Sequence, residues 1–451
     1  MGEITDILLG YANIDSGLDI PYEEVRELQL AAINERFQEE VDNIKLVSMR
    51  AADANISEIR SLEDIVPMLL PHTAYKSYPE SYLSGGKWDK LTRWLNTVSA
   101  RPTDGISLEG IEDIDDWVER LMEGGHYVSC SSGTTGKSAM LDASEKDMEF
   151  GKQNIVRAYC WGAGVEAAPE YHVFGLAPVA QVPKNTALGD ALKKTFSAPG
   201  VEPFQYPVPP ITVGSMTRMI TLRKAMADGT ALPGDFAEFE ATSAARQKTV
   251  EEAVGLSADA LIEARHEKIF LMGMWTSFHA IATEVRNRGY SAKDFHPGNL
   301  IYVGGGLKGA QLPPDYREFF YDTFNIKPER NFMMYSMQEI NTSMPRCQEG
   351  GRYHIPPWLV CLPLNKEGDE LLPIHAGQEV EGRAAFFDLS LDGRWGGIIS
   401  GDKIEVDFSP CQCGARSPSI RDNVVRYSDL QEGDDKIGCA GTVDAYVRGL
   451  S

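Results

Sequence analysis

The sequence predicts an α/β protein with a β-rich later part, and three observations lead to this prediction. Residues 21–60 carry apolar side chains at helical spacing, with glutamates on the opposite face. Residues 125–215 alternate short apolar runs with glycine and proline breaks, and from Tyr335 onward strand and turn patterns dominate. This order of patterns is typical of helices layered on sheets.

Individual segments support this prediction in chain order. The stretch "YEEVRELQLAAINERFQEEVDNI" predicts an amphipathic helix, and residues 233–265, rich in Ala and Glu, predict another. "KIFLMG" predicts a buried strand, followed by a helix over "SFHAIATEVRNRG" that ends at Gly289. "NLIYVGGG" predicts a second strand that runs into a glycine turn, and "RAAFFDLSLDGRWGGIISGDKIEVDF" predicts further strands.

Composition and charge exclude several classes of function. The 451 residues carry a net charge of −23, which argues against a nucleic-acid partner or an anionic membrane surface. No apolar run is long enough to predict a membrane span, and "MGEITDILLG" lacks the basic start of a secretory signal. The seven cysteines are irregularly spaced. We therefore expect a cytoplasmic protein with reduced thiols.

One segment has the composition of a phosphate-binding loop. It consists of Ser131, Ser132, Gly133, Thr134, Thr135, Gly136, Lys137 and Ser138. The P-loop pattern requires a glycine five positions before Gly136, where this chain has Ser131. Two glycines would still let the backbone approach an anion, while hydroxyls, amides and the Lys137 ammonium neutralise it. A flexible surface loop is the alternative, and the two apolar flanks favour the anion-binding interpretation.

This loop resembles the signature loop of the adenylate-forming enzymes, the acyl-CoA synthetase superfamily. Later segments follow in the same order as in that family: "GGG" at Gly304, Gly305 and Gly306, "MMYSMQE" with Tyr335 and Glu339, "ISGD" with Asp402, and "VRYSD" with Arg426 and Asp429. The resemblance covers residues 125–430. It implies a large adenylation domain of stacked sheets flanked by helices.

The resemblance also implies a role for each matched residue. The glycine segment and Tyr335 would lie near adenine, Glu339 would hold Mg²⁺, and Asp402 would bind the ribose hydroxyls of ATP. Arg426 would contact ribose or phosphate, and Asp429 would be the hinge. Two branches are most similar: "CQCGARSP" resembles a segment of phenylacetate–CoA ligase, and "GGGLKG" resembles one of the luminescence-type acyl-protein synthetases.

The chain departs from the family pattern after the hinge. We expect a helical N-terminal part (1–120), an α/β core (121–330), a β-rich ATP-side subdomain (331–429) and a short tail (430–451). Only 22 residues follow Asp429, so the small C-terminal domain of the family and its catalytic lysine are expected to be missing. Lys308 is a candidate for the missing positive charge, and an ordinary solvated lysine is the alternative.

The tail contains Cys439, and luminescence-type synthetases are acylated on a cysteine close to their C-terminus. The sequence thus predicts ATP- and Mg²⁺-dependent activation of a carboxylic acid, followed by transfer to a protein thiol, with an acyl-accepting protein or reductase as partner. A small buried cysteine is the alternative for Cys439. Two other functions stay open: an aryl- or fatty-acid CoA ligase, which would bind CoA, and a non-catalytic partner subunit.

Two pairs of residues suggest a metal site. Cys347 and His354 are separated by six residues in "CQEGGRYH", and Cys411 and Cys413 form a C-x-C pair. Three thiolates and an imidazole are a suitable set for a closed, structural Zn²⁺. Unligated thiols and an unligated histidine are the alternative.

Overall fold

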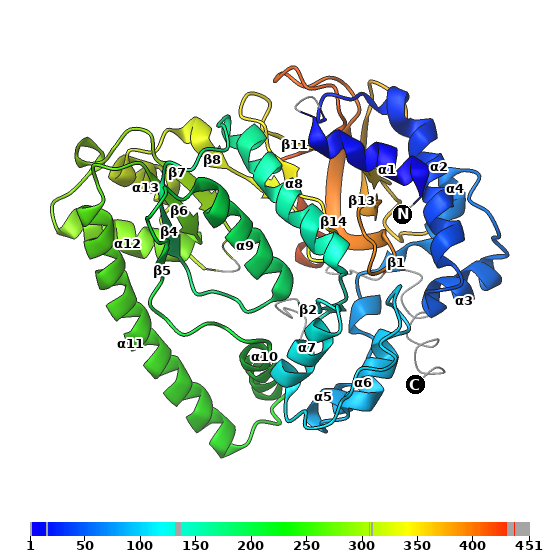
Figure 1. Cartoon of the computed structure of the whole chain (residues 1–451), viewed down its shortest axis with the longest axis horizontal. Helices are drawn as coiled ribbons and strands as arrows, with labels where there is room; N and C mark the ends of the chain where they lie inside the picture. Colours follow the sequence, from blue (N-terminus) through cyan, green and yellow to red (C-terminus); the bar gives the residue numbers. More distant parts are fainter. Residues whose placement is uncertain are drawn as a thin grey trace. The chain divides into compact units, whose positions relative to one another are not determined.

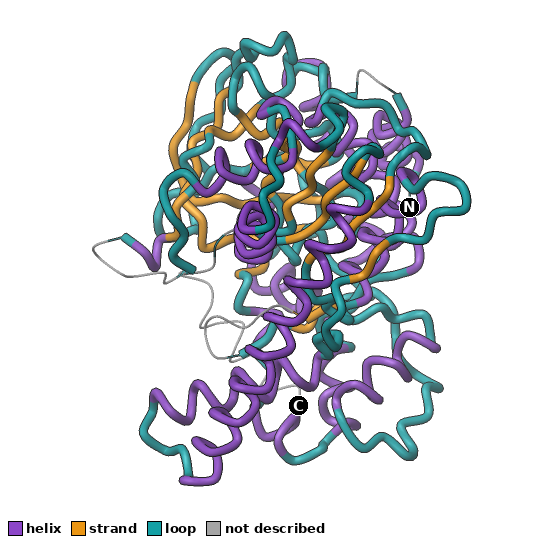
Figure 2. The backbone as a smooth tube through the Cα atoms, turned by 90° about the vertical axis from the view of Figure 1, so that its left-hand side faces the viewer, coloured by secondary structure: helices purple, strands orange, loops and turns teal. Residues whose placement is uncertain are grey.

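The computed structural model describes residues 2–14, 17–130, 137–305, 307, 310–430 and 437. The chain forms two compact units: a first unit of Met1–Asn154 with Met334–Ser451, and a second unit of Ile155–Met333. Helices and strands are both abundant (Figures 1 and 2), which confirms the predicted α/β class. In the described part of the chain no helix is both long and apolar enough to cross a membrane.

The first unit begins with a series of helices between Glu3 and Glu123. They are α1 (Glu3–Gly10), η1 (Tyr11–Asn13), α2 (Tyr22–Glu40), α3 (Lys45–Ala54), α4 (Leu62–Ile65), η2 (Val66–Met68), η3 (Ala74–Lys76), α5 (Glu80–Ser84), α6 (Trp88–Leu95) and α7 (Ile114–Glu123). The helical pattern of residues 21–60 is thus divided into α2 and α3. Between them lies a turn over residues 41–43, followed by the fully buried Ile44, whose extended backbone precedes α3.

A seven-stranded sheet forms the centre of the first unit, in the order β11-β15-β14-β13-β12, with β1 and β16 also paired to β14. Its strands are β1 (Leu70–Pro71), β11 (Arg352–His354), β12 (Leu359–Cys361), β13 (Glu379–Asp388), β14 (Gly397–Asp407), β15 (Ser419–Arg421) and β16 (Val425–Arg426). The strand pairs are antiparallel apart from β1–β14. The short helix η6 (Tyr427–Asp429) follows β16. The β-rich later part is therefore confirmed.

Two small antiparallel pairs complete the first unit. β2 (Ser129–Cys130) pairs with β3 (Met140–Leu141), and β9 (Met334–Tyr335) pairs with β10 (Met344–Pro345). The helix α8 (Glu145–Ala163) begins in the first unit and continues into the second.

The second unit contains a parallel sheet of five strands in the order β5-β4-β6-β7-β8. The strands are β4 (His172–Leu176), β5 (Phe204–Gln205), β6 (Ile269–Gly273), β7 (Leu300–Val303) and β8 (Asn331–Phe332). The helices are α9 (Pro183–Phe196), α10 (Val213–Ala227), α11 (Pro233–Glu263), α12 (Trp275–Asn287), η4 (Ala292–Asp294), α13 (Tyr316–Phe324) and η5 (Pro328–Arg330). The predicted strands β6 and β7 and the predicted helices α11 and α12 are confirmed.

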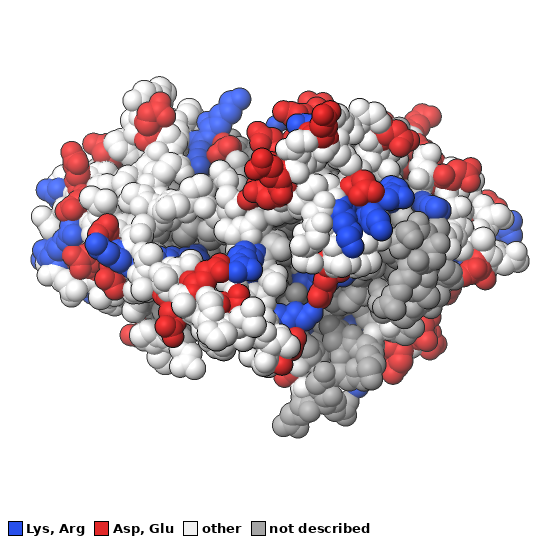
Figure 3. All heavy atoms as spheres, turned by 90° about the horizontal axis from the view of Figure 1, so that it is seen from below, with Lys and Arg blue, Asp and Glu red and all other residues white. Residues whose placement is uncertain are grey.

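The surface view in Figure 3 shows acidic and basic side chains interspersed over the face that it presents.

Candidate active site

The two ends of the predicted phosphate loop are held together by a strand pair. Ser129 lies opposite Leu141, and Cys130 lies opposite Met140. The loop residues 131–136 lie outside the described part of the chain. Because β2 ends directly before the loop and β3 begins shortly after it, the loop starts and finishes at one place in the first unit.

Lys137, the lysine of this loop, contacts Tyr78. Its Nζ donates a hydrogen bond to the carbonyl oxygen of Tyr78 and lies 4.3 Å from the centroid of the Tyr78 ring. The Tyr78 hydroxyl donates to the carbonyl oxygen of Ser138 at 2.8 Å, and the Tyr78 side chain is fully buried. Tyr78, which we did not predict from the sequence, therefore anchors the C-terminal end of the loop.

Three of the residues predicted to bind adenosine lie together in the first unit. The Tyr335 hydroxyl donates to Oδ2 of Asp402 at 2.7 Å, and Nε of Arg426 lies 3.7 Å from Oδ1 of Asp402. Tyr335 is on β9, while Asp402 and Arg426 are directly opposite each other on β14 and β16. Burial, together with the Asp402 carboxylate, raises the pKa of Tyr335, so its hydroxyl keeps the proton that it donates.

Glu339, the predicted magnesium ligand, lies between β9 and β10 and is half-buried. The buried Arg394 fixes its backbone: Nη2 of Arg394 donates to the carbonyl oxygens of Gln338 and Glu339, both at 3.1 Å. Nη1 of the same guanidinium donates to the carbonyl oxygen of Asp142 at 2.6 Å. A planar guanidinium can join these carbonyls because its donors point in fixed directions.

The backbone on the other side of Glu339 is held by a carboxylate. Oδ2 of Asp388, a fully buried residue at the end of β13, accepts hydrogen bonds from the backbone N–H groups of Asn341 (2.7 Å) and Thr342 (2.9 Å). Arg394 and Asp388 thus restrain the peptide before and after Glu339. Neither residue was predicted from the sequence; the only signals were a charged residue after an apolar run in "FFDLS" and an arginine beside a tryptophan among glycines in "DGRWGG".

Asp142 also belongs to a buried pair with His126. Nδ1 of His126 lies 2.8 Å from Oδ2 of Asp142, and Ser99 Oγ donates to the same oxygen at 2.5 Å. The hydrogen bond to Asp142 raises the pKa of His126, while burial opposes the shift. The pair supports the segment whose carbonyl Arg394 contacts.

This pair predicts a pH dependence of stability. Because the folded protein binds the His126 proton more tightly, the pair contributes stability that is fully present below about pH 6.5 and is lost as the pH rises through the folded pKa. His126→Asn retains a donor near Nδ1 and removes the titration. We expect the melting temperature of the wild type to exceed that of this variant most at acidic pH. Thermal unfolding across the pH range checks this, with the exposed His375→Gln as control; a difference that does not change with pH would contradict it.

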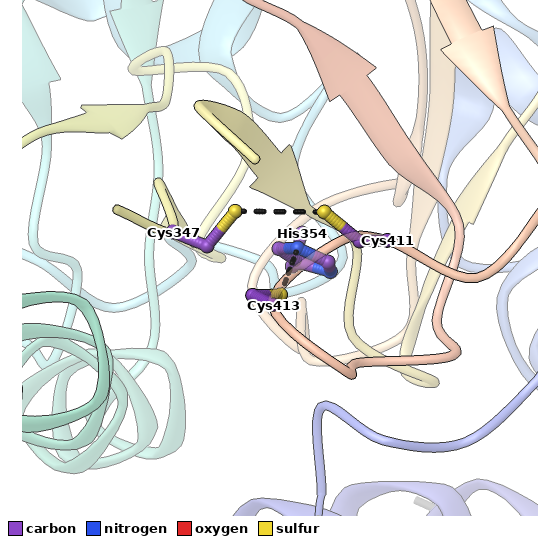
Figure 4. Close-up of side chains that lie close together, drawn as sticks. All are labelled: Cys347, His354, Cys411 and Cys413. Atoms are coloured by element: carbon purple, nitrogen blue, oxygen red, sulfur yellow. Dashed lines mark hydrogen bonds between the residues drawn. The ribbon is translucent and has the colours of Figure 1, made fainter. Parts of the chain in front are cut away.

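The four residues predicted to bind a metal also lie together, and Figure 4 shows their side chains directed toward one another. Sγ of Cys347 is 3.7 Å from Sγ of Cys411, and Sγ of Cys413 is 3.4 Å from Nε2 of His354. The ligand atoms of all four lie within 4.8 Å of one another. His354 is on β11, Cys347 follows β10, and Cys411 and Cys413 lie between β14 and β15.

The remaining predicted residues lie in the second unit or outside the described part of the chain. Gly304 and Gly305 belong to the second unit, where they follow β7; the N–H of Gly304 donates to the carbonyl oxygen of Gly273 at 2.8 Å. Gly305 has a φ of 109°, which favours glycine. Gly306, Lys308 and Cys439 lie outside the described residues. Their roles stay predictions.

Solved structures with a similar fold exist. An open conformation of 2-hydroxyisobutyryl-CoA ligase in complex with 2-HIB-AMP and CoA matches with a TM-score of 0.55 and 12% identity, over 91% of this chain and 71% of that chain. The same ligase in the thioesterification state, also with 2-HIB-AMP and CoA, matches with a TM-score of 0.55 and 13% identity, over 91% and 70%. Its postadenylation state with R3-HIB-AMP matches with a TM-score of 0.54 and 12% identity, over 92% and 71%.

At these identities the likeness shows the fold alone, and it confirms the predicted α/β fold of stacked sheets flanked by helices. No protein-family model matches the chain, and no curated protein matches it either.

Proposed function

We propose that this protein is an ATP-dependent ligase that activates a carboxylic acid as an acyl-adenylate and then transfers the acyl group to CoA. The observation that carries the proposal is the cluster of Tyr335, Asp402 and Arg426. Glu339 follows Tyr335 by four residues, and Arg394 holds its backbone in place. A carboxylate paired with a hydroxyl and a guanidinium suits a ribose ring and its phosphate. The shared fold of a ligase solved with an acyl-adenylate and CoA supports the same function.

In the first step a carboxylate oxygen of the acid attacks the α-phosphorus of ATP, and the bond to pyrophosphate breaks with its electron pair leaving on pyrophosphate. The residues need only align two anions and neutralise charge. In the proposal Asp402 accepts hydrogen bonds from the ribose hydroxyls, while Lys137 and the loop 131–138 hold the phosphates. Glu339 offers a hard carboxylate oxygen to Mg²⁺, which, when bound, would offset the charge on the phosphate oxygens.

Lys137 can bind a phosphate without losing Tyr78. Its Nζ donates one hydrogen bond to the Tyr78 carbonyl oxygen, and an ammonium group has three donors. A phosphate oxygen is a stronger acceptor for such a donor than a neutral carbonyl oxygen is.

In the second step the CoA thiolate attacks the acyl carbonyl carbon, and AMP leaves. We favour CoA over the protein cysteine that the sequence suggested first, because two of the similar ligase structures contain CoA.

The acceptor can be tested directly. The full chain is incubated with ATP, Mg²⁺ and a panel of aryl, aliphatic and hydroxy acids, with and without CoA, and both the small-molecule products and the intact protein are analysed by mass spectrometry. We expect an acyl-CoA thioester only when CoA is present, together with unmodified protein. An acyl adduct on Cys439 without CoA would instead support an acyl-protein synthetase and overturn the assignment of CoA.

Asp402→Asn should weaken ATP binding specifically at the ribose. Losing one charged hydrogen-bond acceptor costs about 1.5–3 kcal/mol, so we expect KM for ATP to rise roughly tenfold to a hundredfold. The wild type should discriminate strongly against 2′-deoxy-ATP or 3′-deoxy-ATP, and the variant should discriminate much less. Steady-state kinetics with the three nucleotides measure this. Equal discrimination by both proteins would contradict the ribose contact; the exposed Asp369→Asn is a matched control.

A further inference from the structure

We propose that Cys347, His354, Cys411 and Cys413 form a closed tetrahedral zinc site that joins the β9–β10 pair to the seven-stranded sheet. The metal would thereby hold the strand that carries Tyr335 in place next to the strand that carries Asp402. The proposed metal site is independent of the proposed reaction, because its four ligands have no role in that reaction.

The distances between the ligand atoms already match a zinc site. At a Zn–S distance of about 2.3 Å and a Zn–N distance of about 2.05 Å, ideal tetrahedral angles place two sulfurs roughly 3.8 Å apart and a sulfur and a nitrogen roughly 3.6 Å apart. The structure has 3.7 Å between the sulfurs of Cys347 and Cys411, and 3.4 Å between Cys413 Sγ and His354 Nε2. All four ligand atoms lie within 4.8 Å of one another, so small side-chain movements would bring them to a single ion.

The histidine is oriented by a second hydrogen bond. Nδ1 of His354 lies 3.0 Å from Oγ of Ser417, and both residues are fully buried. This contact leaves Nε2 directed at Cys413 (Figure 4). A hydrogen bond at the far nitrogen is how proteins usually fix the ring of a metal-binding histidine.

The backbone around the cluster is shaped to bring the thiols together. The N–H of Cys347 donates to the carbonyl oxygen of Arg352 at 2.9 Å, and the N–H of Cys411 donates to that of Ala415 at 2.8 Å. A Cβ at Gly350 would lie 2.2 Å from Sγ of Cys411 and 3.2 Å from Sγ of Cys347. Only glycine at this position leaves space for the two sulfurs.

A disulfide or a hard cation fits the cluster less well than zinc does. A disulfide between Cys347 and Cys411 would require the sulfurs to approach to about 2.05 Å, and it would involve neither Cys413 nor His354. Three soft thiolates and an imidazole favour Zn²⁺ over Mg²⁺ or Ca²⁺, which prefer oxygen ligands. Four protein ligands also leave no open position, so the site would be structural.

The four ligands lie on different strands, and their positions determine which strands a metal would connect. Cys347 follows β10, which pairs with β9 through Met344 and Tyr335. Cys411 and Cys413 follow β14, the strand of Asp402, and His354 is on β11. The hydrogen bond from Tyr335 to Asp402 spans the same two groups of strands. A metal would therefore stabilise the relative position of the two residues that the proposed reaction needs for adenosine.

The test begins with metal analysis of the purified full chain, without ATP or acid. We expect one zinc ion per chain, lost in Cys411→Ser and in Cys413→Ser and retained in the control Cys160→Ser, whose half-buried thiol lies on α8. After removal of zinc, Co²⁺ added to the wild type should give the visible absorption of a tetrahedral thiolate site. This second measurement keeps the test valid if the cysteine variants do not fold.

Hydrogen exchange tests the structural consequence. Removal of zinc from the wild type should accelerate exchange in peptides covering residues 334–347 and 398–421 and leave the β6 and β7 peptides of the second unit unchanged. Absence of zinc together with absence of Co²⁺ binding would overturn the site. Bound zinc whose removal leaves exchange unchanged in both peptides would overturn its connection to Tyr335 and Asp402. Neither result depends on catalysis, so failure of the metal site and failure of the proposed ligase are distinguishable.

Discussion

Glu339→Gln is expected to lower acid-dependent ATP–pyrophosphate exchange by roughly 100-fold or more, because a metal on the phosphate oxygens contributes several kcal/mol to the transition state. The amide keeps the size of the side chain and loses its negative charge. Because Arg394 and Asp388 contact the backbone on each side of Glu339 and not its carboxylate, we expect the variant to fold normally.

The dependence on Mg²⁺ makes this prediction specific. If Glu339 holds the metal, the variant requires a higher Mg²⁺ concentration for half-maximal exchange, and its melting temperature stays close to that of the wild type. The exposed Glu367→Gln is the matched control and should leave both quantities unchanged. If Glu339→Gln and the wild type showed equal exchange at every Mg²⁺ concentration, Glu339 would not be the metal ligand.

Arg394 is expected to affect both stability and activity. Arg394→Met leaves the carbonyl oxygens of Asp142, Gln338 and Glu339 without the donors that they now have. A buried polar group left without a partner costs about 1–3 kcal/mol, so we expect the free energy of unfolding to fall by roughly 3 kcal/mol. Urea denaturation of the variant, with the exposed Arg60→Met as control, measures this loss.

The variant Arg394→Lys distinguishes the effect of Arg394 on the position of Glu339 from its effect on the stability of the protein. Lysine retains the charge but cannot reach three carbonyl oxygens in fixed directions, so it should recover much of the stability and little of the placement of Glu339. We expect normal folding with a raised Mg²⁺ requirement, the same signature as in Glu339→Gln. A lysine variant with the wild-type Mg²⁺ dependence would show that Arg394 is structural only.

The fold was largely predictable where the sequence pattern is long and regular. β6 and α12 were predicted because an apolar run is followed by a helical pattern that ends at Gly289. The division of residues 21–60 into two helices was not predicted, although Asp42 and Asn43, which favour turns, lie where α2 ends. The apolar residues of this region continue at helical spacing across the turn, so the pattern alone does not show the break.

The candidate site was predictable only where a motif marks it. Tyr335 and Asp402 are 67 positions apart and were predicted from motifs, and the structure brings them into contact. The four residues of the metal cluster were predicted from two short-spaced pairs. Arg394, by contrast, acts on Glu339 through main-chain carbonyl oxygens, and main-chain contacts impose no residue pattern on the segment that they hold.

The measurement that tests the central claim most directly is ATP–pyrophosphate exchange by the full chain with a panel of carboxylic acids. If the protein forms acyl-adenylates, labelled pyrophosphate enters ATP only when an accepted acid is present, and Asp402→Asn and Glu339→Gln both suppress the exchange. Absence of exchange with every acid of the panel, from folded protein supplied with Mg²⁺, would contradict adenylation by this chain.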